Sequence, residues 1–134
     1  MTPIHSVSAI VPSIFASSSG LNTVACWCSV RHHSTEKCTI GTSANAQGGL
    51  VAGGVQAETR QTMENIKDVL ERSGSSLDRV VKCTVFMADM REWDAMNQVY
   101  VTFFPRNKPA RSALGANGLA LGARVEIECL AAVP

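Results

Sequence analysis

The sequence feature that most constrains the fold is a segment of helical periodicity, Val55–Arg72. Apolar side chains recur there at the spacing of one helix face. They are Met63, Ile66, Val69 and Leu70. Glycines bracket the segment, with Gly53 before it and Gly74 after it, as is typical of helix ends. The pattern predicts an amphipathic helix that packs its apolar face into a core.

Three later segments have the pattern of strands. Residues Arg79–Met87 are rich in β-branched side chains, Ala110–Leu114 form a short apolar stretch, and Arg124–Ala131 alternate apolar with polar residues. A second amphipathic helix is expected before the second strand, and proline ends it. Its apolar residues are Trp93, Met96, Tyr100 and Phe103.

The order helix, strand, helix, strand, strand predicts an α+β fold with two helices packed on one face of a sheet. We expect Arg79–Met87 to pair in parallel with a later strand through the second helix. An antiparallel pairing of the last two strands would bring Arg111 and Glu126 to one rim.

The composition changes near residue 48. Residues 1–48 hold nine of the thirteen serines and all three histidines, and no helix or strand period runs through them for long. We therefore expect a divergent, disordered N-terminal segment over residues 1–47 and one domain over residues 48–134.

Charge and hydropathy exclude two classes of protein. Twelve Lys and Arg oppose eleven Asp and Glu, so the net charge is +1, which argues against a nucleic-acid partner. The sequence lacks a run of 18 apolar residues, and we expect no membrane span.

The sequence contains five cysteines, an odd number, and their spacing is irregular. Both properties argue against the disulfide framework of a secreted protein. Cys83 and Cys129 lie in apolar, β-branched stretches and are expected to be small buried side chains. This usage favours a reducing compartment. We expect a cytoplasmic location, with a mitochondrial one as the alternative.

Residues of metal-ligand type gather near the N-terminus, where Cys26, Cys28 and Cys38 accompany His32 and His33. Their spacing is not that of a zinc site. We expect neither a metal nor an organic cofactor.

Arg111 and Glu126 are the candidate chemical pair. Arginine grips a carboxylate through two parallel hydrogen bonds, and a nearby carboxylate can orient or deprotonate a water molecule. The alternative for this pair is an ordinary surface salt bridge. The alternative for a third polar candidate, Asn97, is a solvated or capping amide.

Four segments resemble the RidA (YjgF, reactive intermediate deaminase) family at the family's spacing. They are Gly53–Asn65, Val80–Asp89, Pro109–Ser112 and Arg124–Glu128. The Pro-Ala-Arg-Ser segment followed by Arg-Val-Glu-Ile-Glu is the most specific part. The helix that carries Asn97 and Tyr100 fits the same register.

This resemblance implies a chorismate-mutase-like fold, and a homotrimer with a pocket at each subunit interface. It implies hydrolysis of small 2-imino acids, such as 2-iminobutanoate and 2-iminopropanoate, to 2-oxo acids and ammonia without a cofactor. Arg111 would hold the substrate carboxylate and Glu126 would position the attacking water. Asn97, Ser112 and Ala113 would complete the substrate site.

The N-terminal part departs from the family pattern. Members begin with strands that carry a Gly-Pro-Tyr-Ser-Gln-type and then a Ser-Gly-Gln-type segment, and residues 1–48 contain neither. The family's N-terminal strands therefore look replaced. Two alternatives to the deaminase stay open, which are a non-catalytic binding protein and a translation-inhibiting ribonuclease. The near-neutral charge counts against the ribonuclease.

Overall fold

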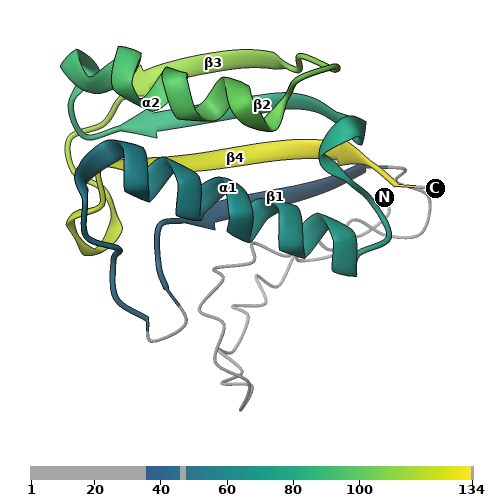
Figure 1. The fold of residues 1–134 in the computed structure, drawn as a ribbon, viewed down its shortest axis with the longest axis horizontal. Coiled ribbons are helices and arrows are strands. Elements are labelled where there is room, and N and C mark those ends of the chain that lie inside the picture. Colours follow the sequence, from purple (N-terminus) through teal and green to yellow (C-terminus); the bar gives the residue numbers. More distant parts are fainter. Residues whose placement is uncertain (1–35, 46–47, 134) are drawn as a thin grey trace, which may run out of the picture.

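The computed structural model describes residues 36–45 and 48–133, which form a four-stranded sheet with two helices packed against it (Figure 1). The strands are β1 (Glu36–Thr42), β2 (Val80–Met87), β3 (Ala110–Gly115) and β4 (Val125–Ala132), in the order β1-β4-β2-β3. The helices are α1 (Gly54–Arg72) and α2 (Trp93–Tyr100). Four short 3₁₀ turns link these elements: Leu77–Arg79, Met90–Glu92, Val101–Phe103 and Ala120–Gly122. The predicted α+β class is confirmed.

Helix α1 begins and ends where glycine permits a left-handed backbone. Gly53 precedes it with φ 118°, and Gly74 follows it with φ 77°. At the C-terminal end, the amide of Ser75 donates to the carbonyl of Leu70 and that of Gly74 to the carbonyl of Glu71. This double closure satisfies two carbonyls that the helix leaves unpaired.

The parallel pairing of β2 with β3 is confirmed, and α2 lies in the crossover between them. The expected pairing of the last two strands is wrong, because β4 pairs antiparallel with β2 and β1. The crossover lays β3 along one side of β2 and leaves the other side of β2 open for β4. Strand β2 therefore separates Arg111 from Glu126.

Strand β1 lies N-terminal to residue 48, which is the predicted start of the domain. Its seven residues are mostly polar and carry no alternating pattern of their own, so its pairing with β4 specifies the strand. The expectation of disorder over residues 1–35 lies outside the described residues.

Gly41 of β1 packs directly beneath α1. A Cβ atom at this position would lie 2.6 Å from Ile66 Cγ1 and 2.9 Å from the carbonyl oxygen of Thr62. Only a residue without a side chain allows the strand and the helix to approach this closely.

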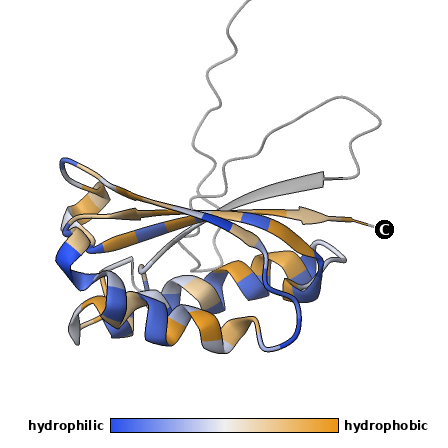
Figure 2. Ribbon diagram, turned by 90° about the horizontal axis from the view of Figure 1, so that it is seen from above, coloured by the Kyte–Doolittle hydropathy of each residue, from blue (hydrophilic) through white to orange (hydrophobic). Residues whose placement is uncertain are grey.

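The two helices cover one face of the sheet (Figure 2). Because side chains alternate along a strand, the opposite face carries the other half of each strand's side chains. We call this the open face. From β2, β3 and β4 it carries Lys82, Thr84, Phe86, Ser112, Leu114, Glu126, Glu128 and Leu130. Among the described elements, no helix covers it.

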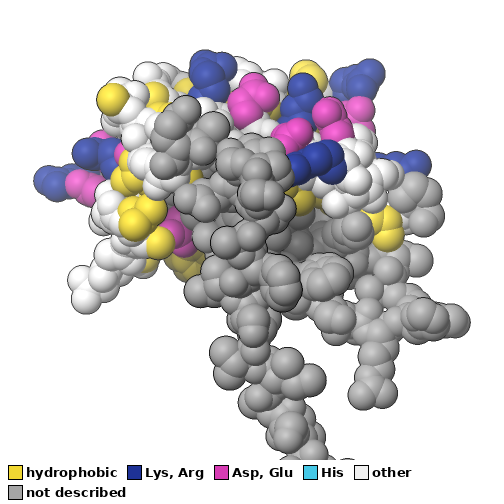
Figure 3. All heavy atoms as spheres, turned by 90° about the horizontal axis from the view of Figure 1, so that it is seen from below, with side chains coloured by type: hydrophobic (Ala, Val, Ile, Leu, Met, Phe, Trp, Pro, Cys, Tyr) yellow, Lys and Arg dark blue, Asp and Glu magenta, His cyan; other side chains and the backbone are white. Residues whose placement is uncertain are grey.

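Charges of both signs lie side by side on the surface that Figure 3 shows. The described residues form four ion pairs: Arg72–Asp68, Arg91–Asp89, Arg106–Asp78 and Arg124–Glu92. On the described part of the surface in Figure 3, basic side chains lie beside acidic ones rather than in a continuous stripe of the kind that binds a phosphate backbone. Neither α1 nor α2 combines the length and apolarity needed to cross a lipid bilayer.

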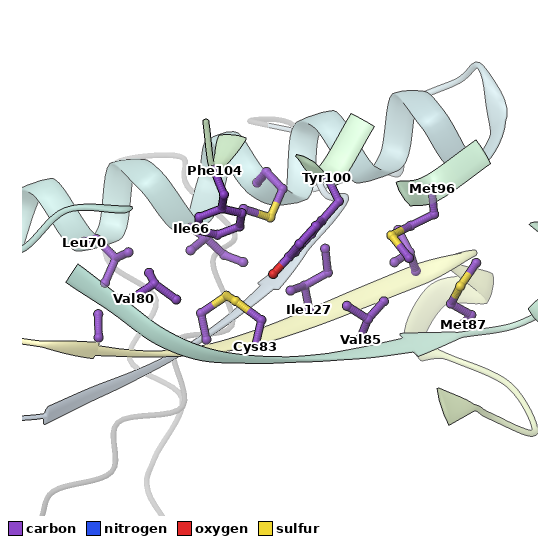
Figure 4. Packing of buried hydrophobic residues seen from close by; sticks show 14 of the residues in the cluster. Ile66, Leu70, Val80, Cys83, Val85, Met87, Met96, Tyr100, Phe104 and Ile127 are labelled. Carbon is purple, nitrogen blue, oxygen red and sulfur yellow. A yellow bond between two sulfur atoms is a disulfide. The ribbon is translucent and has the colours of Figure 1, made fainter. Parts of the chain in front are cut away.

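The core lies between the helices and the sheet (Figure 4). From α1 it takes Met63, Ile66 and Leu70, as predicted, whereas Val69 is only half-buried. The chain continues after α2 as a 3₁₀ turn, which has fewer residues per turn than an α-helix. For this reason Phe104 is buried in the core instead of the predicted Phe103.

Cys83 and Cys129 are both fully buried, as predicted, but they form a disulfide that the cysteine pattern did not indicate. The two residues lie directly opposite each other on β2 and β4, with Cα atoms 4.2 Å apart. Residues that lie directly opposite each other on neighbouring strands at this distance have their side chains in contact, so the two sulfur atoms lie close enough to bond. The tertiary pairing brings together cysteines that are 46 residues apart in sequence.

A buried carboxylate joins α1 to the ends of two strands. Glu58 Oε2 accepts a hydrogen bond from Ser43 Oγ at 3.0 Å and another from the backbone amide of Arg124 at 2.8 Å. Only 5% of Glu58 is exposed. These two donors compensate for the burial of the carboxylate.

Candidate functional site

The candidate site forms around Arg111, on the edge strand β3. Arg111 lies opposite Cys83 of β2, so its side chain is on the face that the helices cover. There Nη1 donates a hydrogen bond to Asn97 Oδ1 of α2 at 2.7 Å. Pro109, just before the strand, cannot donate a backbone hydrogen bond and suits an edge position. The structure therefore brings together two predicted site residues from separate elements.

Two aromatic rings hold the same guanidinium. Arg111 Cζ lies 5.2 Å from the ring centroid of Trp93 and 4.7 Å from that of Tyr100. Such contacts attract a cation to the electron-rich ring faces without neutralising its charge. Among the described residues, no carboxylate pairs with Arg111. The guanidinium is thus fixed in place while its charge remains available to an anion.

Trp93, Asn97 and Tyr100 form one stripe along α2, at positions i, i+4 and i+7. The apolar spacing of this helix predicts Trp93 and Tyr100 on the core face and does not indicate their contact with Arg111. The spacing of the three residues could have indicated this contact. Residues at positions i, i+4 and i+7 lie on the same side of a helix, so the amide and the two aromatic rings face the same neighbouring element.

The Tyr100 hydroxyl points into the core, on the side of the disulfide (Figure 4). It is buried and has no hydrogen-bond partner among the described residues. Burial raises the pKa of Tyr100 to about 12, and the positive charge of Arg111 opposes this shift. The face of the Tyr100 ring therefore contacts Arg111, whereas the hydroxyl group points into the core and does not contribute to the candidate site.

A cavity of about 190 Å³ adjoins Arg111. Its lining is Tyr100, Val101, Phe104, Lys108, Pro109 and Arg111. A larger hollow of about 420 Å³ lies beside the C-terminal half of α1, but its cations Lys67 and Arg106 share it with the carboxylates Glu71 and Asp78, and Arg106 pairs with Asp78 at 2.6 Å. The smaller cavity is therefore the better candidate for binding an anion.

The remaining predicted residues are divided between the two faces of the sheet. Ala113 lies opposite Val85, on the same face as Arg111, and packs half-buried against the core. Ser112 lies opposite Thr84, on the open face, and is exposed. Ala113 therefore lies on the Arg111 side of the sheet, and Ser112 does not.

Glu126 also lies on the open face, opposite Phe86. Its Oε1 accepts a hydrogen bond from the backbone amide of Ala120 at 3.1 Å, which orients the carboxylate. Arg111 and Glu126 thus belong to opposite faces and to strands that are not neighbours. Within one chain they do not form a single site, contrary to the expectation of a shared rim.

Residues 36–45 and 48–133 contain no group of three His, Cys, Asp or Glu side chains that could hold a metal ion. The N-terminal cysteines and histidines considered as ligands lie outside the described residues or have side chains that are not described.

The sequence profile described as endoribonuclease L-PSP matches residues 37–133. Among curated proteins, the chain is similar to "Protein mmf2, mitochondrial" of Schizosaccharomyces pombe, with 41% identity over 95 residues, covering 69% of this chain and 75% of that protein.

The chain is also similar to the 2-iminobutanoate/2-iminopropanoate deaminase of Mus musculus, with 41% identity over 86 residues. This match covers 64% of each chain, so it spans less than two thirds of the mouse protein. Among solved structures, E. coli TdcF with bound serine superposes with a TM-score of 0.70 at 28% identity, covering 75% of this chain and 82% of that one.

Proposed function

Because the chain belongs to the endoribonuclease L-PSP family, also called the RidA/YjgF family, we propose that it hydrolyses small 2-imino acids to 2-oxo acids and ammonia. Relatives named 2-iminobutanoate/2-iminopropanoate deaminase support this reaction class. Of the two locations expected, a relative named as mitochondrial supports the mitochondrial one.

The observation that carries the proposal is the state of Arg111. Asn97 and two aromatic rings fix its guanidinium, and no described carboxylate neutralises it. In our proposal the guanidinium binds the substrate carboxylate through two parallel hydrogen bonds. The TdcF structure contains serine, itself a small molecule with a carboxylate, which is consistent with such a ligand.

The reaction requires the protein mainly to orient the substrate and a water molecule. The carbon of a protonated imine is electrophilic, so water adds to it and forms a new C–O bond. A proton then returns to the nitrogen, the C–N bond breaks, ammonia leaves, and the remaining C–OH group loses its proton to become the 2-oxo group. Fixing the carboxylate sets the position of this carbon relative to the water. The reaction also needs a carboxylate that accepts a proton from the attacking water.

We assign this carboxylate to Glu126, with one geometric condition. Because Glu126 lies on the opposite face of the sheet from Arg111, it reaches the substrate only if a second copy of the chain supplies it. The homotrimer that the family resemblance implies would provide such a copy. The proposed site is therefore shared between subunits.

The proposal is tested by generating 2-iminobutanoate from threonine with a dehydratase and measuring 2-oxobutanoate and ammonia. The purified protein should accelerate product formation above the spontaneous rate, and Arg111→Met should abolish the acceleration. A wild-type protein no faster than buffer would favour the non-catalytic alternative, in which the same guanidinium only binds carboxylates.

A further inference from the structure

The cavity beside Arg111 contains a second cation, Lys108. Lys108 and Arg111 are three positions apart in the sequence, which is at most about 11 Å of extended chain. Both side chains are long, so their charged groups can converge on one small molecule. The ammonium group of lysine provides three donors and strong attraction for a carboxylate.

Neither cation has a carboxylate partner among the described residues. Their neighbour Arg106 shows the contrast, since it pairs with Asp78 at 2.6 Å. The stretch from Arg106 to Arg111 therefore has one paired cation outside the cavity and two cations that line it without a described carboxylate partner. An anion with two charged groups would compensate both of them.

The rest of the cavity lining is apolar. Val101, Phe104 and Pro109 provide hydrocarbon surface beside the two charges. A volume of about 190 Å³ is below the range of roughly 300–1,000 Å³ of pockets for drug-sized ligands. The cavity therefore suits a short carbon chain that carries a charged group at each end.

We propose that Lys108 selects substrates with a second, terminal carboxylate, so that the cavity binds 2-imino and 2-oxo dicarboxylic acids of four or five carbons. This inference rests on the proposed function, because Arg111 has to hold the first carboxylate. Lys108 binds the second carboxylate, and the short methylene chain contacts the apolar wall. The hydrolysis is unchanged, since the second carboxylate takes no part in bond formation or cleavage.

The test is calorimetric binding of two product analogues that have five carbons each. 2-Oxoglutarate ends in a carboxylate and 2-oxopentanoate ends in a methyl group. The wild-type protein should bind 2-oxoglutarate about fivefold more tightly, as expected for one partly exposed ion pair. Lys108→Met should remove this preference, because it weakens the binding of 2-oxoglutarate more than that of 2-oxopentanoate. Lys67→Met, which changes an exposed lysine of α1 away from the cavity, should keep the preference.

Two outcomes would overturn this inference alone, namely equal affinity of the wild-type protein for both acids, or a preference that survives in Lys108→Met. A different result would contradict the proposed function itself. If Arg111→Met bound both acids as tightly as the wild-type protein, the assignment of the first carboxylate to Arg111 would be wrong. The two failures are therefore distinguishable in one set of titrations.

Discussion

The guanidinium of Arg111 lies 4.7 Å from the ring centroid of Tyr100, whose hydroxyl is buried without a hydrogen-bond partner in the described part of the chain. One face of this ring meets a cation, and its polar tip enters an apolar core. Burial disfavours the phenolate, whereas the nearby positive charge favours it. The pKa of Tyr100 therefore reports on the occupancy and charge of the site.

We predict that Tyr100 titrates near pH 12 in the folded protein rather than near 10. The chain has one tyrosine, so tyrosinate absorbance measures this group alone. Between these pH values the unfolded chain has lost a proton that the folded chain keeps, so stability falls as the pH rises. The Arg111→Met variant should titrate at still higher pH, and titration in denaturant should return to about 10. A midpoint near 10 in the native protein would contradict the burial of the hydroxyl.

Arg111→Ala should lower kcat/KM for 2-iminobutanoate by roughly a hundredfold, because it removes two charge-assisted hydrogen bonds to the carboxylate. Arg111→Lys should restore little, since an ammonium group lacks the planar fork. Arg106→Ala is the matched control in the same segment, where the lost ion pair is exposed. Equal activity of Arg111→Ala and Arg106→Ala would rule out the proposed role of Arg111.

Glu126→Gln should lower kcat more than it weakens binding, because the amide does not accept the proton of the water. If the site is shared between copies, co-expressing Glu126→Gln chains with Arg111→Met chains should restore activity. Random assembly would give roughly a quarter of the wild-type rate, since one site in four combines two unaltered residues. Complete inactivity of the mixed assemblies would place both residues in the same chain.

Glu58→Ala should lower the free energy of unfolding by about 3 kcal/mol, because Ser43 Oγ and the amide of Arg124 lose their acceptor. Chemical denaturation followed by circular dichroism measures this change. Glu64→Ala, at an exposed position of the same helix, should change stability by less than about 0.5 kcal/mol. Similar losses in both variants would rule out a specific contribution of the buried carboxylate to stability.

Gly41→Ala should destabilise the protein by about 3 kcal/mol, because the new methyl group would overlap Ile66 and the carbonyl of Thr62. Gly49→Ala provides the control, since its nearest neighbouring atom would be 3.9 Å away. Thermal unfolding of both variants tests the close packing of β1 under α1. Equal melting temperatures would mean that this contact does not form.

The sequence by itself determined the elements that have a strong period. Helix α1 begins within one residue of its predicted start and ends at Arg72, as predicted, because apolar spacing and the flanking glycines are local properties. Strands β2 and β4 and the parallel crossover through α2 follow from the same patterns. Arg111 and Asn97 could be chosen as candidates because their chemistry and the family resemblance agree.

Only the tertiary structure decided which residues meet. The order of the strands is a non-local choice, and it put β2 between Arg111 and Glu126 and joined Cys83 to Cys129. Strand β1 has no period of its own and depends on its pairing with β4. The face on which a side chain lies depends on register, and a shift of one residue exchanges the two faces. For this reason the sequence could name Arg111 and Glu126, whereas their positions on opposite faces of one sheet could come only from the folded chain.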